Sequence, residues 1–292
     1  AGASINYGVV RLNANGTLDT TFGDLVGSSR TGKALLDLGA NTGDNAYSLV
    51  TQTDGKILIA GYTTAQPSGT GSNNNYGVVR LNANGNLDTT FGSSGTALLD
   101  LGAGTGDSAY SVVTQTDGKI LIAGVTKAQP SGSTGTSTNY GIARLNADGS
   151  LDTSFGELVG SSRTGKALLD LGADTTDIAY SLVTQTDGKI LIAGNTTAQP
   201  AGNTGTSTNY GVVRLNANGT LDTTFGSSGK ALLDLGANTS DYAYSLVTQT
   251  DGKILIAGYT TAQPSGTGSN NNYGVVRLNA NGTLDTTFGS SG

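Results

Sequence analysis

The chain has 292 residues, 46 of them Gly, with a formal net charge of −6, and it contains no His, Cys, Met or Trp. Without His and Cys, a Ser-His-Asp triad, a cysteine nucleophile and the common zinc sites are excluded. The acidic balance argues against nucleic acid and anionic membrane surfaces as partners, and no apolar run approaches the roughly 20 residues of a membrane span.

One sequence pattern recurs along the chain. Asn-Tyr-Gly, followed by an apolar pair and Arg-Leu-Asn, begins at Asn6, Asn75, Asn139, Asn209 and Asn272, with spacings of 69, 64, 70 and 63 residues. Alternate copies match best, because the steps from Tyr7 to Tyr140 and from Tyr140 to Tyr273 both span 133 residues. This period predicts an array of repeat units, most simply organised as two-unit super-repeats.

Within the unit of residues 33–82, strands are expected in chain order at 34–38, 46–52, 56–61 and 76–82. Residues 46–52 alternate apolar and polar side chains, which is the period of a strand. The run 56–61 is apolar on both faces, as in a sheet covered on both sides. A sheet of this kind cannot bury itself alone, so the units are expected to pack on one another.

Tight turns are expected between these strands. Asp54-Gly55 predicts a two-residue type I′ hairpin turn, in which both central residues have positive φ. The same turn is expected in every unit, with its glycine at Gly55, Gly118, Gly188 and Gly252.

The sequence therefore predicts one repeat array over residues 1–292. Complete units are expected at 33–82, 96–146, 166–216 and 230–280, with a partial unit at 6–32. The fold class is all-β, a repeat protein of four-stranded antiparallel blades that is β-propeller-like, with an open superhelical β-array as the alternative. The sequence leaves open whether the array closes into a ring or forms a filament, and how many repeats the parent protein has.

Three motifs carry a family resemblance. They are Gln-Thr-Asp-Gly-Lys-Ile-Leu-Ile-Ala-Gly (first at 52–61), Arg-Leu-Asn-Ala-Asn-Gly-Thr-Leu-Asp (11–19) and Leu-Asp-Thr-Thr-Phe-Gly (18–23). Together they resemble the bacterial delta-60 repeat, a β-propeller-like family with no assigned function. The resemblance covers nearly the whole chain and implies a large, exported, multi-repeat protein. It supplies no catalytic or ligand residues.

The first candidate site is an oxygen-rich turn that suits Ca²⁺, which takes six to eight oxygen ligands. Its residues are Asp37, Asn41 and Asp44, with counterparts at Asp100, Asp107, Asp170, Asp174, Asp177, Asp234, Asn238 and Asp241. No EF-hand or glycine-rich nonapeptide pattern accompanies them. We therefore favour Asp and Asn as turn caps, and expect no metal and no cofactor.

The second candidate is an arginine repeated on the fourth strand of each unit. Its copies are Arg11, Arg80, Arg144, Arg214 and Arg277. An anion site is one interpretation, but recurrence in every unit favours a structural ion pair with an Asp of Leu-Asp-Leu-Gly or of Leu-Asp-Thr-Thr-Phe.

The third candidate is the Thr/Ser/Asn-rich loop at 63–75, with copies at 126–139, 196–209 and 260–272. Its hydroxyl and amide groups suit sugars. Tyr62 and Tyr259 flank it in two copies, whereas Val125 and Asn195 replace them in the others. We favour a plain surface loop over a lectin site.

From these patterns we expect a non-enzymatic, extracellular or cell-surface scaffold with no catalytic residues, a component of a fibre, sheath or adhesin stalk. Paired carboxylates for glycoside hydrolysis remain available by residue type, but every such Asp is repeated, whereas a catalytic site is normally unique. The alternative is a multivalent carbohydrate-binding module that recognises surface glycans. The expected partner is the protein itself, joined end to end through residues 7–13 and 278–292. Ala1 is expected to be a mature or trimmed start.

Overall fold

A computed structural model describes residues 5–67, 72–263, 270–289 and 292. The described residues form β-strands and connecting turns, with no helix among them. The chain divides into two compact units, a first unit of residues 1–122 and 144–152 and a second unit of residues 123–143 and 153–292. Neither unit has, in its described part, a helix long and apolar enough to cross a membrane.

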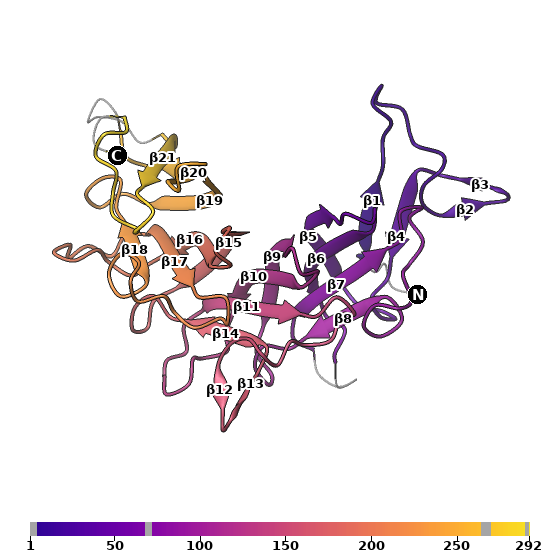
Figure 1. The fold of residues 1–292 in the computed structure, drawn as a ribbon, viewed down its shortest axis with the longest axis horizontal. Helices are drawn as coiled ribbons and strands as arrows, with labels where there is room; N and C mark the ends of the chain where they lie inside the picture. Colours follow the sequence, from indigo (N-terminus) through magenta and orange to yellow (C-terminus); the bar gives the residue numbers. More distant parts are fainter. Residues whose placement is uncertain (1–4, 68–71, 264–269, 290–291) are drawn as a thin grey trace. The chain divides into compact units, whose positions relative to one another are not determined.

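The first unit contains three groups of strands (Figure 1). A two-stranded sheet pairs β1 (Tyr7–Val10) with β4 (Lys33–Leu36), and a short hairpin pairs β2 (Leu25–Val26) with β3 (Ser29–Arg30). A four-stranded sheet has the order β5 (Asp44–Thr51), β6 (Ile57–Thr63), β7 (Asn75–Leu81), β8 (Thr96–Leu99).

The second unit repeats this plan. It contains the hairpin of β12 (Leu158–Val159) and β13 (Ser162–Arg163), and a four-stranded sheet of β15 (Asp177–Thr184), β16 (Ile190–Thr196), β17 (Asn209–Leu215) and β18 (Lys230–Leu233). A three-stranded sheet follows, of β19 (Asp241–Thr248), β20 (Ile254–Thr260) and β21 (Asn272–Leu278). One further sheet, of order β14 (Lys166–Leu169), β11 (Asn139–Leu145), β10 (Ile120–Thr126), β9 (Asp107–Thr114), is divided between the two units.

The principal strands are those expected from the sequence, but the hairpins β2–β3 and β12–β13 were not expected, and the sheets group the strands differently. The apolar run that opens each sequence unit pairs with the preceding unit: β4 pairs with β1, and β8 pairs with β7. In the turn after β4, the Asp44 carboxylate accepts a hydrogen bond from the Leu38 amide at 3.0 Å and so closes the connection between β4 and β5. Each full sheet thus combines three strands of one sequence unit with the first strand of the next, and the last sheet has, among the described residues, three strands instead of the expected four.

The Asp-Gly turns are also different in type from the expected two-residue turn. The Gly55 amide donates to the Gln52 carbonyl at 3.0 Å, and the Gln52 amide donates to the Lys56 carbonyl at 2.7 Å. Only the glycine has positive φ, +82° at Gly55. This is a three-residue loop closed by a bulge, because Asp54 stays at negative φ and caps the Lys56 amide at 3.0 Å.

The core of each unit is built from strands buried on both faces. Every residue of β6 except Tyr62 is buried, as is every residue of β7, which agrees with the continuous apolar run of 57–59. In the first unit Tyr7, Phe22, Ile59, Val79 and Leu81 share one buried cluster. This burial makes the middle strands the rigid support for side chains on the edge strands β5, β9, β15 and β19.

Candidate functional site

The repeated arginines lie in a recurring network, four of them on the third strand of a sheet in chain order and Arg11 directly after β1. The Nε of Arg80 donates to the Asp88 carboxylate at 2.7 Å, and the guanidinium carbon lies 4.6 Å from the centre of the Phe91 ring. Its Nη1 donates to the Ala147 carbonyl at 2.5 Å, in the next repeat along the chain. Arg80 is only 6% exposed, so its charge is satisfied by protein groups rather than by a bound anion.

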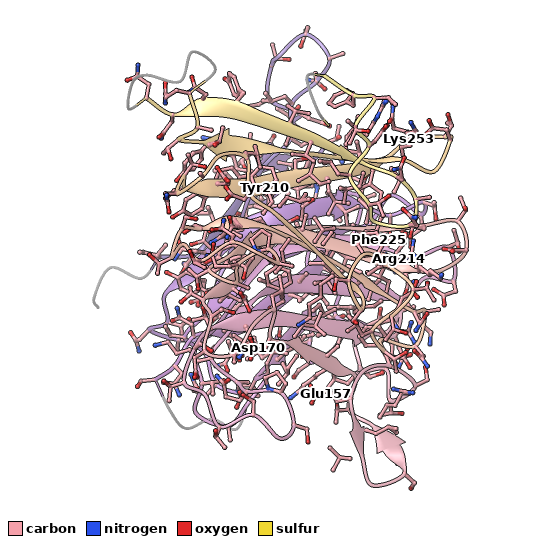
Figure 2. All side chains as sticks on the ribbon, turned by 90° about the vertical axis from the view of Figure 1, so that its left-hand side faces the viewer. Glu157, Asp170, Tyr210, Arg214, Phe225 and Lys253 are labelled. Carbon is pink, nitrogen blue, oxygen red and sulfur yellow. The ribbon has the colours of Figure 1, made fainter. Side chains whose placement is uncertain are left out.

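The second unit contains the same network. Arg214 lies over Phe225, with 4.7 Å between the guanidinium carbon and the ring centre (Figure 2). It pairs with Asp222 at 2.7 Å and donates to the Ala280 carbonyl at 2.6 Å. Of the two carboxylates available by sequence, the structure brings the Asp of Leu-Asp-Thr-Thr-Phe to the arginine. The remaining copies, Arg11, Arg144 and Arg277, pair with Asp19, Asp152 and Asp285.

A lysine completes four of the five networks, with Lys56, Lys119, Lys189 and Lys253 as the added cations, and the Arg11–Asp19 pair stands without one in the described part of the chain. Lys56 Nζ lies 3.0 Å from the Asp88 carboxylate, which therefore faces two cations. Burial raises the pKa of Asp88, but hydrogen bonds from Thr90 and Lys56 and the charge of Arg80 outweigh it, and the net pKa is lowered. Asp88 is thus ionised at neutral pH and holds the hairpin turn to the third strand.

The acidic turns have their oxygens occupied by the fold. Asp44 is fully buried, and its carboxylate accepts hydrogen bonds from the Leu38 amide at 3.0 Å and the Thr63 hydroxyl at 2.5 Å. Asp37 accepts the Gly39 amide at 3.0 Å, and Asn41 has a φ of +63°. The other turns repeat this arrangement, with Asp107, Asp177 and Asp241 buried, Asp100, Asp170 and Asp234 as amide acceptors, and positive φ at Asp174 and Asn238.

These turns bring no metal-binding group of acidic side chains together. Among the described residues there is no cluster of three or more His, Cys, Asp or Glu side chains that could hold a metal ion.

Burial raises the pKa of Asp177 to about 6, and the hydrogen bonds from Thr196, Leu171 and Thr175 only partly oppose it.

The polar loops use many of their side chains to hold themselves closed. Gln66 Nε2 donates to the Thr64 and Asn73 carbonyls at 2.9 and 2.6 Å, and Asn75 Nδ2 donates to the Ala65 carbonyl at 3.0 Å. Equivalent bonds close 126–139 and 196–209. Residues 68–71 of the loop at 63–75 and residues 264–269 of the loop at 260–272 lie outside the described residues.

The structure reveals a feature that the sequence analysis missed, a pair of tyrosine clusters on the edge strands. The first tyrosine cluster is Tyr47, Tyr62 and Tyr110, in the first unit. The Tyr47 ring centre lies 6.0 Å from that of Tyr62 and 5.0 Å from that of Tyr110. Tyr47 is 52% exposed although it lies in the middle of β5.

The second tyrosine cluster, in the second unit, is Tyr180, Tyr242, Tyr244 and Tyr259. Ring centres of Tyr180 and Tyr244 are 5.1 Å apart, and those of Tyr244 and Tyr259 are 5.9 Å apart. Tyr242 stacks on Tyr259 at 4.7 Å with an interplanar angle of 17°. Tyr244 is 48% exposed.

A β-bulge aims the principal tyrosine of each cluster. The pairing of β5 with β6 skips Tyr47, because Ala46 faces Gly61 and Ser48 faces Ala60. The same shift leaves Tyr180 and Tyr244 as the extra residues of β15 and β19. Bulges of this kind redirect a side chain and are frequent near functional sites.

A glycine in the partner strand makes each bulge sterically allowed. A Cβ added to Gly61 would overlap the carbonyl oxygen of Asn45, and the same overlap occurs between Gly194 and Ile178 and between Gly258 and Tyr242. A sequence signal for this feature exists, since Ala-Tyr-Ser or its equivalent recurs in all four units at Tyr47, Tyr110, Tyr180 and Tyr244. The pattern alone does not show that a bulge moves these rings out of the regular alternation of side chains along the strand.

Comparison with solved structures finds a likeness to the sucrose-6-phosphate hydrolase from Lactobacillus gasseri, with 15% sequence identity and a TM-score of 0.41. The match covers 81% of this chain and 46% of that one, so the chain spans less than half of that protein's length. This finding stands against the expectation that the chain is not an enzyme, and that expectation is withdrawn. The likeness assigns no activity and no residue role to this chain. The comparison with curated proteins gives no match.

A family model described as "Domain of unknown function (DUF5122) beta-propeller" matches residues 1–22, 52–91, 115–155, 185–225 and 249–288, more than half of the chain. The match confirms the all-β, β-propeller fold expected from the repeats, and the delta-60 resemblance is compatible with it. The chain therefore belongs to the family of DUF5122 beta-propeller domains, whose function is unknown.

Proposed function

We propose that this protein is a structural repeat scaffold on the bacterial cell exterior, and that it assembles with further copies of itself by exchanging one strand. The observation that carries the proposal is the outer edge of β21. The corresponding edges of β7 and β17 are covered by β8 and β18. The edge of β21 pairs with no strand in the described part of the chain, and Tyr273 there is 97% exposed.

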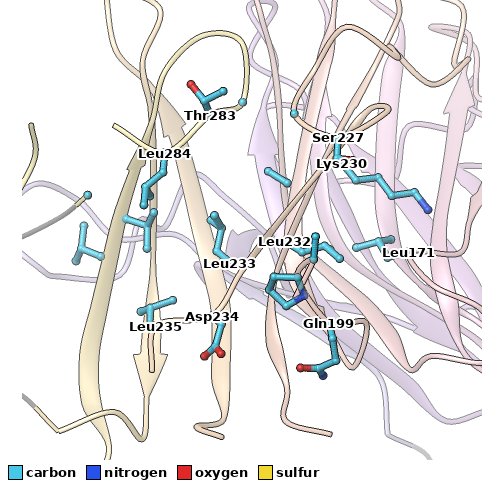
Figure 3. A pocket seen from close by; sticks show the side chains of 18 residues that line it. Leu171, Gln199, Ser227, Lys230, Leu232, Leu233, Asp234, Leu235, Thr283 and Leu284 are labelled. Atoms are coloured by element: carbon cyan, nitrogen blue, oxygen red, sulfur yellow. The ribbon is translucent and has the colours of Figure 1, made fainter. Parts of the chain in front are cut away.

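An apolar groove of about 1070 Å³ runs beside this edge (Figure 3). Its lining includes Leu233, Leu235, Val275, Val276 and Leu284. In the preceding sheet the equivalent positions, Val212 and Val213, face Ala231 and Lys230 of β18. The groove therefore has the place and the polarity that suit a Lys-Ala-Leu-Leu strand.

A second copy contains such a strand in β4. Strands β4 and β18 have the same sequence, Lys-Ala-Leu-Leu. Residues 7–10 of β1 and residues 273–276 of β21 are also identical, Tyr-Gly-Val-Val. Strand β4 can thus pair with β21 of a neighbour through the same contacts that it makes with β1.

Engineered disulfides test this exchange, because the chain has no native cysteine. Lys33 faces Val10 within the chain, so exchange would place it opposite Val276 of a neighbour. The pair Lys33→Cys with Val276→Cys should form interchain disulfides under oxidation and yield ladders of oligomers on non-reducing gels. Lys33→Cys with Val247→Cys is the mismatched control.

A locking variant supplies the reverse test. Val10→Cys with Lys33→Cys joins β4 to β1, since directly paired Cα atoms lie at disulfide distance. Sedimentation should show assembly that is lost in the oxidised form and recovered on reduction. Monomers at all concentrations, with no interchain disulfide in the exchange pair, would contradict the proposal.

The proposed location rests on the weakly charged, Thr/Ser/Asn-rich composition and on the delta-60 resemblance. Labelling of intact cells with a membrane-impermeant amine reagent tests it. Labelling only after cell lysis would refute a surface location.

A further inference from the structure

We infer that the two tyrosine clusters form binding sites for a neutral polysaccharide, with sugar rings packed against the faces of Tyr47 and Tyr244. This inference is independent of self-association. It rests on three observations: the exposure of these rings, the bulges that aim them, and the polar but uncharged groups around them.

The first observation is the exposure of the Tyr47 and Tyr244 rings. Tyr47 and Tyr244 lie on strands yet are 52% and 48% exposed, whereas Tyr7, Tyr76, Tyr140 and Tyr210 of the Asn-Tyr-Gly motif are at most 1% exposed. The buried tyrosines have a clear structural role, since the Tyr140 hydroxyl donates to the Gly211 carbonyl at 2.9 Å and that of Tyr210 to the Gly274 carbonyl at 2.9 Å. Strand packing does not require exposed rings at Tyr47 and Tyr244.

The backbone is adapted to present these rings. Each bulge places one tyrosine outside the strand register, at the cost of a glycine opposite it. Successive edge strands are also fixed to one another beside the rings. The Val112 amide donates to the Ser48 hydroxyl, and the Leu246 amide donates to the Ser181 hydroxyl, both at 3.2 Å. These bonds keep neighbouring tyrosines at contact distance, so the clusters are formed before a ligand arrives.

The chemistry around the rings selects the ligand class. Asn45 Nδ2 donates to the Tyr62 hydroxyl at 2.5 Å, which ties an amide and a phenol into one polar group next to the Tyr47 ring. Burial and the neighbouring Tyr62 raise the pKa of Tyr47, and burial, Tyr242 and Tyr244 raise that of Tyr259. The phenols are therefore neutral hydrogen-bonding groups at physiological pH.

Aromatic faces beside amide and hydroxyl groups match the two surfaces of a sugar, its apolar C–H face and its rim of hydroxyls. A net charge of −6 disfavours polyanions. A proline-rich peptide also docks on aromatic rings. Several rings held side by side, with hydrogen-bonding groups at their rim, favour the polysaccharide.

The two clusters differ in the residues that surround the principal tyrosine. Tyr242 of the second cluster stands where the first has Asn45, and it stacks on Tyr259. In the two middle repeats the position of Tyr62 holds Val125 or Asn195. Because these two repeats lack the tyrosine that flanks the polar loop, the loops by themselves are a weak indication of sugar binding.

Binding is measured by titrating the full chain with a soluble β-glucan, a galactomannan and dextran. The chain contains 12 Tyr and no Trp, so its intrinsic fluorescence reports on tyrosine alone. We expect at least one of these neutral polymers to bind, and Tyr47→Ala combined with Tyr244→Ala to weaken binding by about tenfold or more, as loss of two stacking contacts predicts.

Two variants separate stacking from general damage. Tyr47→Phe combined with Tyr244→Phe keeps the rings and should bind within about threefold of wild type, because stacking persists without the hydroxyls. Val26→Ala removes an apolar side chain that is 72% exposed on the β2–β3 hairpin and belongs to neither cluster, and it should have no effect. Circular dichroism confirms that each variant is folded.

Three outcomes would overturn the inference. They are the absence of binding to all three polymers, equal binding by the alanine pair and wild type, and binding of a polyproline peptide at these tyrosines without any polysaccharide binding. The disulfide experiments on β4 are unaffected by any of them, so failure here and failure of the scaffold proposal are distinguishable.

Discussion

The identity of single residues in this protein is determined mainly by the contacts that they make with the neighbouring repeat. Arg80 and Arg11 have the same partners, an Asp, a Phe ring and an Ala carbonyl, but different exposure, with side chains 7% and 35% exposed. The chain thus contains its own comparison between a buried and a half-exposed copy of one network.

Arg80→Ala should lower the free energy of unfolding by about 3 kcal/mol, because it leaves the buried Asp88 with one cation fewer. Arg11→Ala should cost less than about 1 kcal/mol, because water replaces the lost partner. Urea denaturation of both variants checks the difference. Equal costs would show that burial does not set the strength of these networks.

The glycine of the Asp-Gly turn at residues 117–118 is required by backbone conformation alone. Gly118 has a φ of +83°, and a Cβ there would lie 3.6 Å from the nearest atom, Ala147 Cβ, which is ordinary contact. Gly118→Val should therefore cost about 1–2 kcal/mol from strain at positive φ. Gly106→Val, where φ is ordinary and the space is open, is the control. An unchanged melting temperature for Gly118→Val would argue against the turn.

Asp177 makes stability depend on pH. Its pKa of about 6 in the folded protein lies above the ordinary value, so folding takes up a proton between these values. Its contribution to stability is complete below about pH 4 and is lost as pH rises through about 6. Asp177→Asn should remove this component, up to ~3 kcal/mol between pH 4 and 7.5. Asp187→Asn, in a hairpin turn, should keep the wild-type slope in urea titrations across this range.

At the scale of elements, the bulged edge strand is the unit that couples fold to candidate site. Gly61→Ala would bring a Cβ onto the Asn45 carbonyl, so β5 must shift and the Tyr47 ring must move. We expect lower thermal stability and altered near-UV tyrosine circular dichroism. At Gly8 the nearest atom to an added Cβ is 4.0 Å away, so Gly8→Ala should be silent in both measurements. A silent Gly61→Ala would contradict the assigned bulge.

At the scale of the whole molecule, stability should vary from sheet to sheet. Strands β6 and β7 are buried on both faces within a four-stranded sheet, whereas β1 and β4 form a two-stranded sheet with Val10 and Leu35 exposed. Amide hydrogen exchange should be slowest in β6 and β7 and fastest in β1 and β4. Uniform protection would contradict this gradient and remove the basis for exchange of β4.

The sequence by itself determined the principal strands, the positions of the turns and the repeat. Alternation at 46–52, the two-sided apolar run at 57–59 and the Asp-Gly and Asn-Gly pairs are local signals, and local signals suffice for local structure. The recurrence of one arginine and one aspartate in every unit likewise indicated a structural pair before either partner was seen.

Tertiary structure alone decided three features. It assigned β4 to β1 rather than to β5, and the pairing of strands in different sheets depends on contacts between residues far apart in the chain. It gave the Asp-Gly loops three residues, since Asp54 stays at negative φ. It also brought Tyr47, Tyr62 and Tyr110 together from three strands. A bulge reverses the face on which a side chain emerges, and contacts between sheets join residues far apart in the chain, so neither is encoded in a local pattern.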